Sequence, residues 1–63
     1  MTPIQESLGK ILTNRINSDY KKGVLNKDAI LRIMDLFLAG DRITADQYVE
    51  LDMLLESLTT PQA

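Results

Sequence analysis

The chain contains no cysteine and no histidine among its 63 residues. Without cysteine it can form neither disulfides nor thiolate metal sites, and without histidine it lacks the commonest general base and the commonest metal ligand. We therefore expect no metal and no cofactor. Because so small a domain has little core and neither of these staples, extra stability has to come from dense helix packing or from self-association.

Long apolar runs are also absent. The longest apolar stretch falls well short of the roughly 20 residues that a helix needs to span a bilayer. The first residues, M-T-P-I-Q-E-S, have neither the basic start nor the apolar core of a secretion signal. We therefore expect no membrane association and a soluble intracellular protein.

Positive charge is scarce, with seven Lys and Arg against nine Asp and Glu and a net charge of −2. Proteins that bind nucleic acids usually have the opposite excess, because much of their affinity comes from neutralising phosphates. A nucleic-acid partner is therefore not expected. Four basic residues of the first half keep a DNA-associated regulator as the third of three hypotheses: Lys10, Arg15, Lys21 and Lys22.

No catalytic constellation is recognisable. Ser7, Ser18 and Ser57 have no histidine to activate them, and the sequence contains neither a G-x-S-x-G elbow nor a phosphate-binding glycine loop. The spacing of Asp41 and Asp46 does not match the twelve-residue calcium loop. We expect that the protein is not an enzyme.

Helical periodicity predicts an all-α fold in one domain spanning residues 1–63, with helices over 3–21, 27–39 and 45–58 and a frayed tail over 59–63. No segment has the strict alternation typical of a strand. Two architectures fit three helices of these lengths: a compact three-helix bundle, or a helical hairpin with a preceding helix. Either is expected to self-associate, for the reason given below.

Residues at the expected helix ends support this reading. Thr2 with Gln5, and Thr44 with Gln47, have the spacing of a capping box, in which each side chain satisfies a backbone N–H of the other residue. Gly23 follows the first helix and is expected to end it in the left-handed conformation. The same start signal therefore occurs twice, at the first and third helices.

The second helix carries an apolar surplus. Residues 29–39 read A-I-L-R-I-M-D-L-F-L-A, and two polar positions cannot form a solvent face, so this helix is predicted to be covered on nearly every side. Exposing three Leu-sized side chains would forgo very roughly 5 kcal/mol, comparable with the whole stability of a small domain. A self-association surface on the second and third helices is predicted from five residues: Leu31, Leu36, Leu38, Val49 and Met53.

The alternative is that the second helix is the central helix of a compact monomer, flanked on both sides. The first helix does not add to the surplus in this reading, because its apolar residues form one stripe that suits one core. The stripe consists of Ile4, Leu8, Ile11, Leu12, Ile16 and Tyr20.

The third helix presents carboxylates on its polar side: Asp46, Glu50, Asp52 and Glu56. These groups would repel phosphates, so a helix-turn-helix that reads DNA with this helix is disfavoured. An acidic face suits a different task, which is to occupy a basic groove on another protein. These four residues are therefore a candidate partner-binding face.

Several segments resemble the XkdX-type small proteins of tailed phages and prophages. Those proteins pair an N-R-I-like helix and a Y-x-x-G turn with a closing G-x-I-T-x-x-Q-Y-x-E-I/L element. Here the corresponding residues are N-R-I at 14–16, Tyr20 with Gly23, K-D at 27–28, and G-D-R-I-T-A-D-Q-Y-V-E-L at 40–51. Between Lys27 and Ile43 the chain departs from the pattern and is longer by one helical turn.

The closing element also resembles the SHOCT short helical motif, L-x-x-G-x-I-T-x-x-E-Y followed by L-L, which here ends at residues 54–55. These resemblances imply a phage- or prophage-encoded accessory protein in the host cytoplasm or in the virion, with no catalytic residues to carry over. The leading hypothesis is therefore a non-enzymatic phage protein that self-associates. The second is a phage inhibitor that docks its acidic face on a host protein such as a defence nuclease or polymerase.

Overall fold

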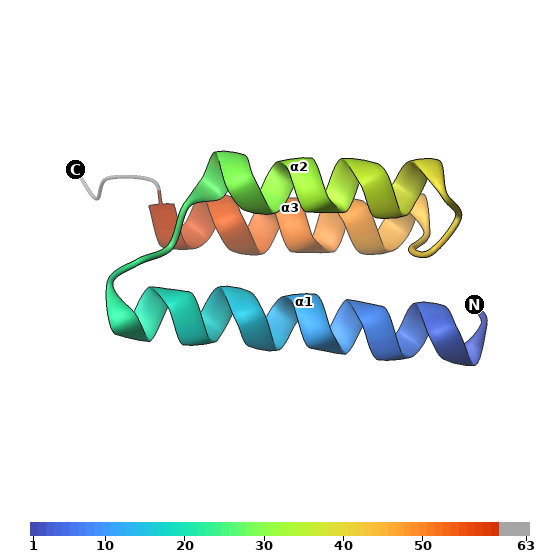
Figure 1. Ribbon diagram of the computed structural model, residues 1–63, viewed down its shortest axis with the longest axis horizontal. Helices are drawn as coiled ribbons and strands as arrows, with labels where there is room; N and C mark the ends of the chain where they lie inside the picture. The colour runs from blue at the N-terminus through green and yellow to red at the C-terminus, as the bar shows by residue number, and fades with distance from the viewer. Residues whose placement is uncertain (60–63) are drawn as a thin grey trace.

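The computed structural model describes residues 1–59, which form three α-helices: α1 (Pro3–Lys22), α2 (Lys27–Ala39) and α3 (Ala45–Thr59) (Figure 1). No strand occurs among these residues, so the predicted all-α class is confirmed, and the architecture is a three-helix bundle. The helices α1 and α3 run in the same direction and α2 runs in the opposite one (Figure 1). Helix α3 packs closely against both α1 and α2, whereas α1 and α2 approach each other less closely.

The helix ends form as their residues predict. Thr2 Oγ1 accepts the Gln5 N–H at 3.2 Å, and Gln5 Oε1 accepts the Thr2 N–H at 2.9 Å. Thr44 and Gln47 make the same pair of bonds at the start of α3, at 3.1 and 2.8 Å. Gly23 ends α1 with a φ of 72°, in the left-handed region where glycine is the least strained residue.

The far end of α3 differs from the prediction by one residue. Thr59, assigned to the frayed tail, is the last residue of the helix and donates a hydrogen bond from Oγ1 to the Leu55 carbonyl at 2.6 Å. Residues 60–63 of the predicted tail lie outside the described part of the chain.

The turn between α2 and α3 contains the one non-glycine residue with positive φ among those described, Asp41 at 57°. Aspartate enters this region with less strain than most residues because its short polar side chain can bond locally. The chain is thereby turned so that Ile43 faces the core and is 1 % exposed. Tyr48 packs against the same core, as a hydrophobic staple at the start of α3 requires.

A single core joins the three helices and this turn. It consists of Leu12 and Ile16 from α1, Ile30 and Met34 from α2, Ile43 from the turn, and Leu51 and Leu55 from α3. All seven side chains are at most 4 % exposed, so the core is closed within one copy of the chain.

The predicted stripe of α1 is wrong at Ile4, Ile11 and Tyr20, which are 66 %, 58 % and 52 % exposed. Leu12 and Ile16 set the buried direction of this helix. Ile4 and Ile11 lie about 100–120° around the helix from this direction, because successive residues are rotated by about 100°. The apolar side of α1 is therefore wider than the part that the core covers. Some of the exposed apolar side chains of the protein lie on α1 for this reason.

The prediction that α2 is covered on nearly every side is also wrong. Ala29, Arg32, Leu36 and Ala39 lie at helical spacing on one exposed line. Two of these residues are alanines, which look apolar in a sequence but lose little by facing water. The alternative, α2 as the central helix, is wrong as well, because α3 is the helix that packs against both others.

Candidate functional site

Two hydrogen bonds join the start of α1 to the α2–α3 turn and to the start of α3. Gln5 Nε2 donates to the Asp41 carbonyl at 3.0 Å, and Gln47 Nε2 donates to the Gln5 carbonyl at 2.7 Å. Each glutamine therefore caps its own helix and also binds the neighbouring segment. Gln47 is only 7 % exposed, so this contact holds a satisfied polar group at the edge of the core.

Gly9 makes this close approach possible. A Cβ at this position would lie 2.6 Å from Gln47 Nε2, inside the distance that real Cβ contacts adopt. A glycine in the middle of a helix costs about 1 kcal/mol relative to alanine. Gln47 thus packs directly against the backbone at Gly9. This contact explains why a glycine occupies a position where helix propensity disfavours it.

Beside this contact, α1 and α3 enclose an open groove of about 640 Å³. Its apolar lining includes Leu51 and Leu54, and charged side chains also line it from both helices. Among the described residues its lining is Met1, Glu6, Gly9, Lys10, Thr13, Asn14, Gln47, Glu50, Leu51 and Leu54.

The outward side of α3 carries residues from both predicted sets. Val49 and Met53 are 55 % and 66 % exposed and lie one turn apart. Asp46 and Glu50 are also exposed and lie on the same face, where they alternate along the helix with Val49 and Met53. We call these four residues the acidic–apolar face. Within residues 1–59 no ion pair engages Asp46 or Glu50.

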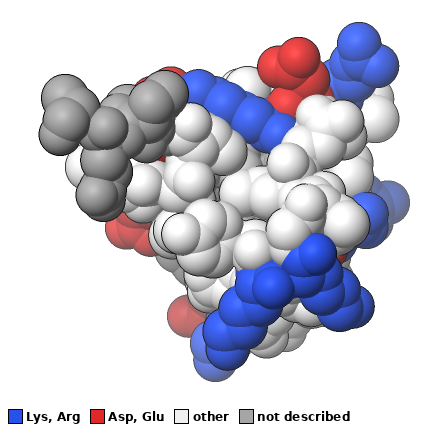
Figure 2. All heavy atoms as spheres, turned by 90° about the vertical axis from the view of Figure 1, so that its left-hand side faces the viewer, with Lys and Arg blue, Asp and Glu red and all other residues white. Residues whose placement is uncertain are grey.

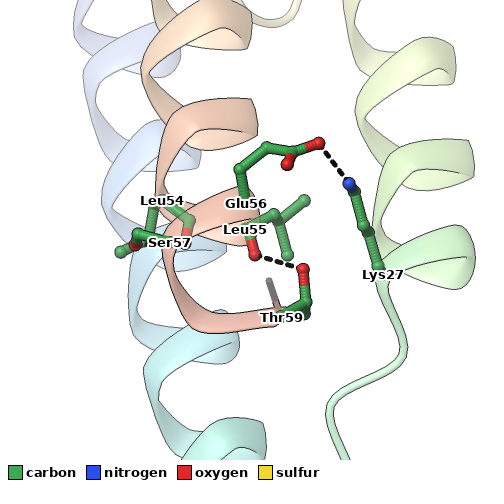
Figure 3. Close-up of polar contacts among 6 residues, drawn as sticks. All are labelled: Lys27, Leu54, Leu55, Glu56, Ser57 and Thr59. Carbon is green, nitrogen blue, oxygen red and sulfur yellow. Dashed lines mark hydrogen bonds and ion pairs between the residues drawn. The ribbon is translucent and has the colours of Figure 1, made fainter. Parts of the chain in front are cut away.

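The other two predicted acidic residues are oriented toward α2. Glu56 forms an ion pair with Lys27, which joins the end of α3 to the start of α2 (Figure 3). The hydrogen bond to Glu56 raises the pKa of Lys27 above its ordinary value, and the negative charge of Asp52 adds to the effect. The structure therefore divides the predicted acidic face into an outward pair and a pair at the α2–α3 boundary.

The predicted self-association set is divided too. Leu31 and Leu38 are half-buried and pack against the core, so the interpretation that they are surplus to the bundle is wrong. Leu36 is 72 % exposed. It lies about 160° around α2 from the buried Met34 and about 100° from Asp35, the residue that bonds to α3, and so points away from both the core and α3. It does not share a face with Val49 and Met53.

The first half of α1 runs beside the second half of α2, where the two helices pack loosely (Figure 1). Both segments carry exposed apolar side chains. This surface was missed in the sequence because Ile4 and Ile11 were assigned to the core; the adjacent pair Ile11–Leu12 was the signal of a wider stripe. We call this surface the α1/α2 seam. Its exposed members are Ile4, Ile11 and Leu36, and its half-buried members are Leu8, Ile33 and Phe37.

The basic residues proposed for DNA binding do not form one stripe. Arg15 pairs with Asp19 at 3.6 Å, and Lys10 lies at the α1–α3 groove. Lys21 and Lys22 lie in the last turn of α1. Figure 2 shows this end of the bundle, with basic side chains at separate places around the rim and uncharged side chains between them.

Other kinds of site find little support in residues 1–59. They contain no cluster of three or more carboxylates that could hold a metal ion, and none of their helices is long and apolar enough to cross a membrane. Comparison of the chain with protein-family models, with curated proteins and with solved structures finds no match.

One polar contact between α3 and α2 makes stability depend on pH. The Tyr48 hydroxyl donates to Asp35 Oδ1 at 2.7 Å. This hydrogen bond, with desolvation and the charge of Asp35, raises the pKa of Tyr48 above its ordinary value of 10.0. Folding therefore favours the neutral phenol, so its contribution is complete below the unfolded pKa and is lost as the pH rises through the folded pKa.

We predict that Tyr48 in a Tyr20→Phe chain ionises above pH 10.0 when followed by tyrosinate absorbance. Asp35→Ala should lower this midpoint, because it removes both the acceptor and the negative charge. Asp28→Ala, on the same helix but without this bond, is the matched control. Equal midpoints in the Asp35→Ala and Asp28→Ala chains would show that the hydrogen bond does not govern the titration.

Proposed function

We propose that this protein is a non-enzymatic helical interaction module that self-associates through the α1/α2 seam. The observation that carries the proposal is a core closed within one chain, with three large apolar side chains left exposed on the neighbouring helices α1 and α2. Ile4, Ile11 and Leu36 are between 58 % and 72 % exposed. Contiguous exposed apolar patches of this kind usually mark interaction sites.

A second copy of the chain suits this surface. None of the six seam residues is charged, so two copies can pair these side chains without burying a charge from within the seam; Arg32, one turn from Leu36 on α2, lies beside it. Such a contact uses the same patch on both copies and closes as a two-fold dimer. Burying three such side chains contributes about 1.5–3 kcal/mol each before the cost of association, so a weak dimer is expected.

Sedimentation equilibrium over micromolar to millimolar concentrations tests self-association. The wild-type chain should sediment as a dimer at the upper end, and Ile11→Lys should shift it to monomer because a charge then lies in the seam. Val24→Lys is the matched control: Val24 is 62 % exposed in the connection after α1, outside the seam. A wild-type chain that stays monomeric at millimolar concentration, or an Ile11→Lys chain that dimerises like Val24→Lys, would overturn the proposal.

We further propose that the protein is a phage or prophage accessory protein. The resemblance to XkdX-type proteins supports this origin, and the matched residues include Gly23, Thr44 and Gln47, whose roles in the fold are helix ends and packing. Position of the gene among tail and lysis genes would support a virion role, and position among early genes would support an inhibitor of a host protein. A gene outside any phage or prophage region would contradict the origin.

A further inference from the structure

Helix α3 differs from the other two helices in its charge. Over Ala45–Thr59 it has four carboxylates and no Lys or Arg, whereas α1 and α2 each carry both signs. Two of the four carboxylates, Asp46 and Glu50, flank the exposed Val49 and Met53 and have no ion-pair partner among residues 1–59. This surface is therefore negative and apolar at once.

We propose that the acidic–apolar face of α3, together with the adjoining α1–α3 groove, binds a basic amphipathic helix of another protein. This surface is distinct from the seam, and the inference does not depend on the chain forming a dimer. It assigns a partner of defined chemistry: a helix with an apolar stripe that is flanked by Lys or Arg.

The shape of the surface fits a helix. Val49 and Met53 form a ridge one turn long, and Glu50 and Leu54 continue from it into the groove along α1. Apolar anchors at positions i and i+3 or i+4 of a partner helix can contact Met53 on the ridge and Leu54 in the groove together. The unbranched thioether side chain of Met53 adapts its conformation to such a neighbour.

The charge of the surface selects a basic partner. Glu50 lines the α3 side of the groove and Glu6 its α1 side, and Asp46 lies one turn before Glu50 on the exposed face of α3. Lys10 is the one basic residue among the described groove residues, so the carboxylates outnumber it. Lys or Arg on the partner would therefore meet unpaired carboxylates, whereas an acidic partner would be repelled.

The test uses isotope-labelled full-length protein and a synthetic helical peptide with a leucine stripe flanked by lysines, followed by NMR. The expected result is saturable binding, with the largest amide shift changes in Asp46–Leu54 and in Gly9–Asn14 of the groove. The same peptide with every Lys replaced by Glu should not bind. A peptide of the same composition with a scrambled order, and so no apolar stripe, should bind at least about tenfold more weakly.

Variants locate the site independently. The double substitution Asp46→Lys, Glu50→Lys and the single substitution Met53→Ser should each weaken peptide binding by about tenfold or more. Asp28→Lys, a charge reversal on the exposed surface of α2, should leave the dissociation constant within about twofold because it lies outside the face. Circular dichroism confirms that each variant keeps its helices.

Three results would overturn the inference. One is an Asp28→Lys effect as large as that of the double variant, which would indicate general charge attraction. Another is a set of shift changes confined to the seam. The last is the appearance of the same α3 shifts on raising the protein concentration without peptide, which would make a second copy the occupant. Because the seam variant Ile11→Lys keeps the α3 face intact, peptide binding by that variant separates this inference from self-association.

Discussion

Replacing Leu55 with alanine is expected to lower the free energy of unfolding by about 2–5 kcal/mol and to leave much of the protein unfolded at room temperature. Leu55 is 0 % exposed and lies in the core that joins all three helices. The truncation removes buried methyl groups and leaves a cavity that the surrounding helices fill only in part. Urea unfolding followed by circular dichroism measures the change.

Leu36→Ala is the matched control, since it deletes the same atoms from a side chain that is 72 % exposed. It should change the free energy of unfolding by no more than about 0.5 kcal/mol when measured at a concentration where the chain is monomeric. Equal effects of the two substitutions would show that the buried and exposed leucines are wrongly assigned. At high concentration Leu36→Ala should in addition weaken the proposed dimer, because Leu36 lies in the seam.

The second large effect concerns Gly9→Ala. We expect its effect on the free energy of unfolding to change sign when Gln47 is replaced. In the wild-type chain Gly9→Ala should destabilise the protein by about 1 kcal/mol, because the added Cβ displaces Gln47 Nε2 from the Gln5 carbonyl and disturbs a buried amide. In a Gln47→Ala background the clash is gone. The same substitution should then stabilise the protein by up to about 1 kcal/mol, the ordinary gain of alanine over glycine within a helix.

A double-mutant cycle at Gly9 and Gln47, followed by thermal or urea unfolding, measures this coupling, which we expect to be about 2 kcal/mol. Gly40→Ala is the control glycine: its φ is −92°, and an added Cβ would meet the Leu36 carbonyl at an ordinary 3.5 Å. Its effect should not depend on Gln47. If Gly9→Ala stabilises the chain in both backgrounds, the amide contact does not limit the approach of α1 and α3.

The two proposed surfaces would let one small chain contact two partners. The α1/α2 seam is uncharged and suits a second copy, whereas the acidic–apolar face is on the outward side of α3 and suits a basic helix. Since Leu36 points away from α3, substitutions at one surface leave the other unchanged. This separation makes the two proposals testable in the same set of variants.

Local chemistry was enough to predict the helices and their starts. Thr2 with Gln5 and Thr44 with Gln47 satisfy backbone N–H groups within three residues, so the requirement is visible in the sequence. Gly23 is likewise recognisable, because only glycine adopts the left-handed conformation without strain. The link between the two capping boxes was not visible, because it joins residues 42 positions apart.

The orientation of each helix about its own axis was the main failure of sequence reasoning. Ile11 and Leu31 are both apolar residues beside a buried neighbour, yet Ile11 is 58 % exposed and Leu31 packs against the core. A wide apolar stripe permits several rotations of a helix, and a sequence read alone does not choose among them. The packing of Gln47 over Gly9 makes the choice for α1.

The amino-acid sequence by itself determined the helical class, the number of helices, their ends and the absence of cysteine and histidine chemistry, since these depend on residue types and short-range bonds. Only the tertiary structure decided which apolar side chains stay in water. It also left the face formed by Asp46, Val49, Glu50 and Met53 exposed while placing Asp52 and Glu56 toward α2. The physical reason is that burial depends on where α3 packs against its two neighbours, and those contacts join residues far apart in the chain.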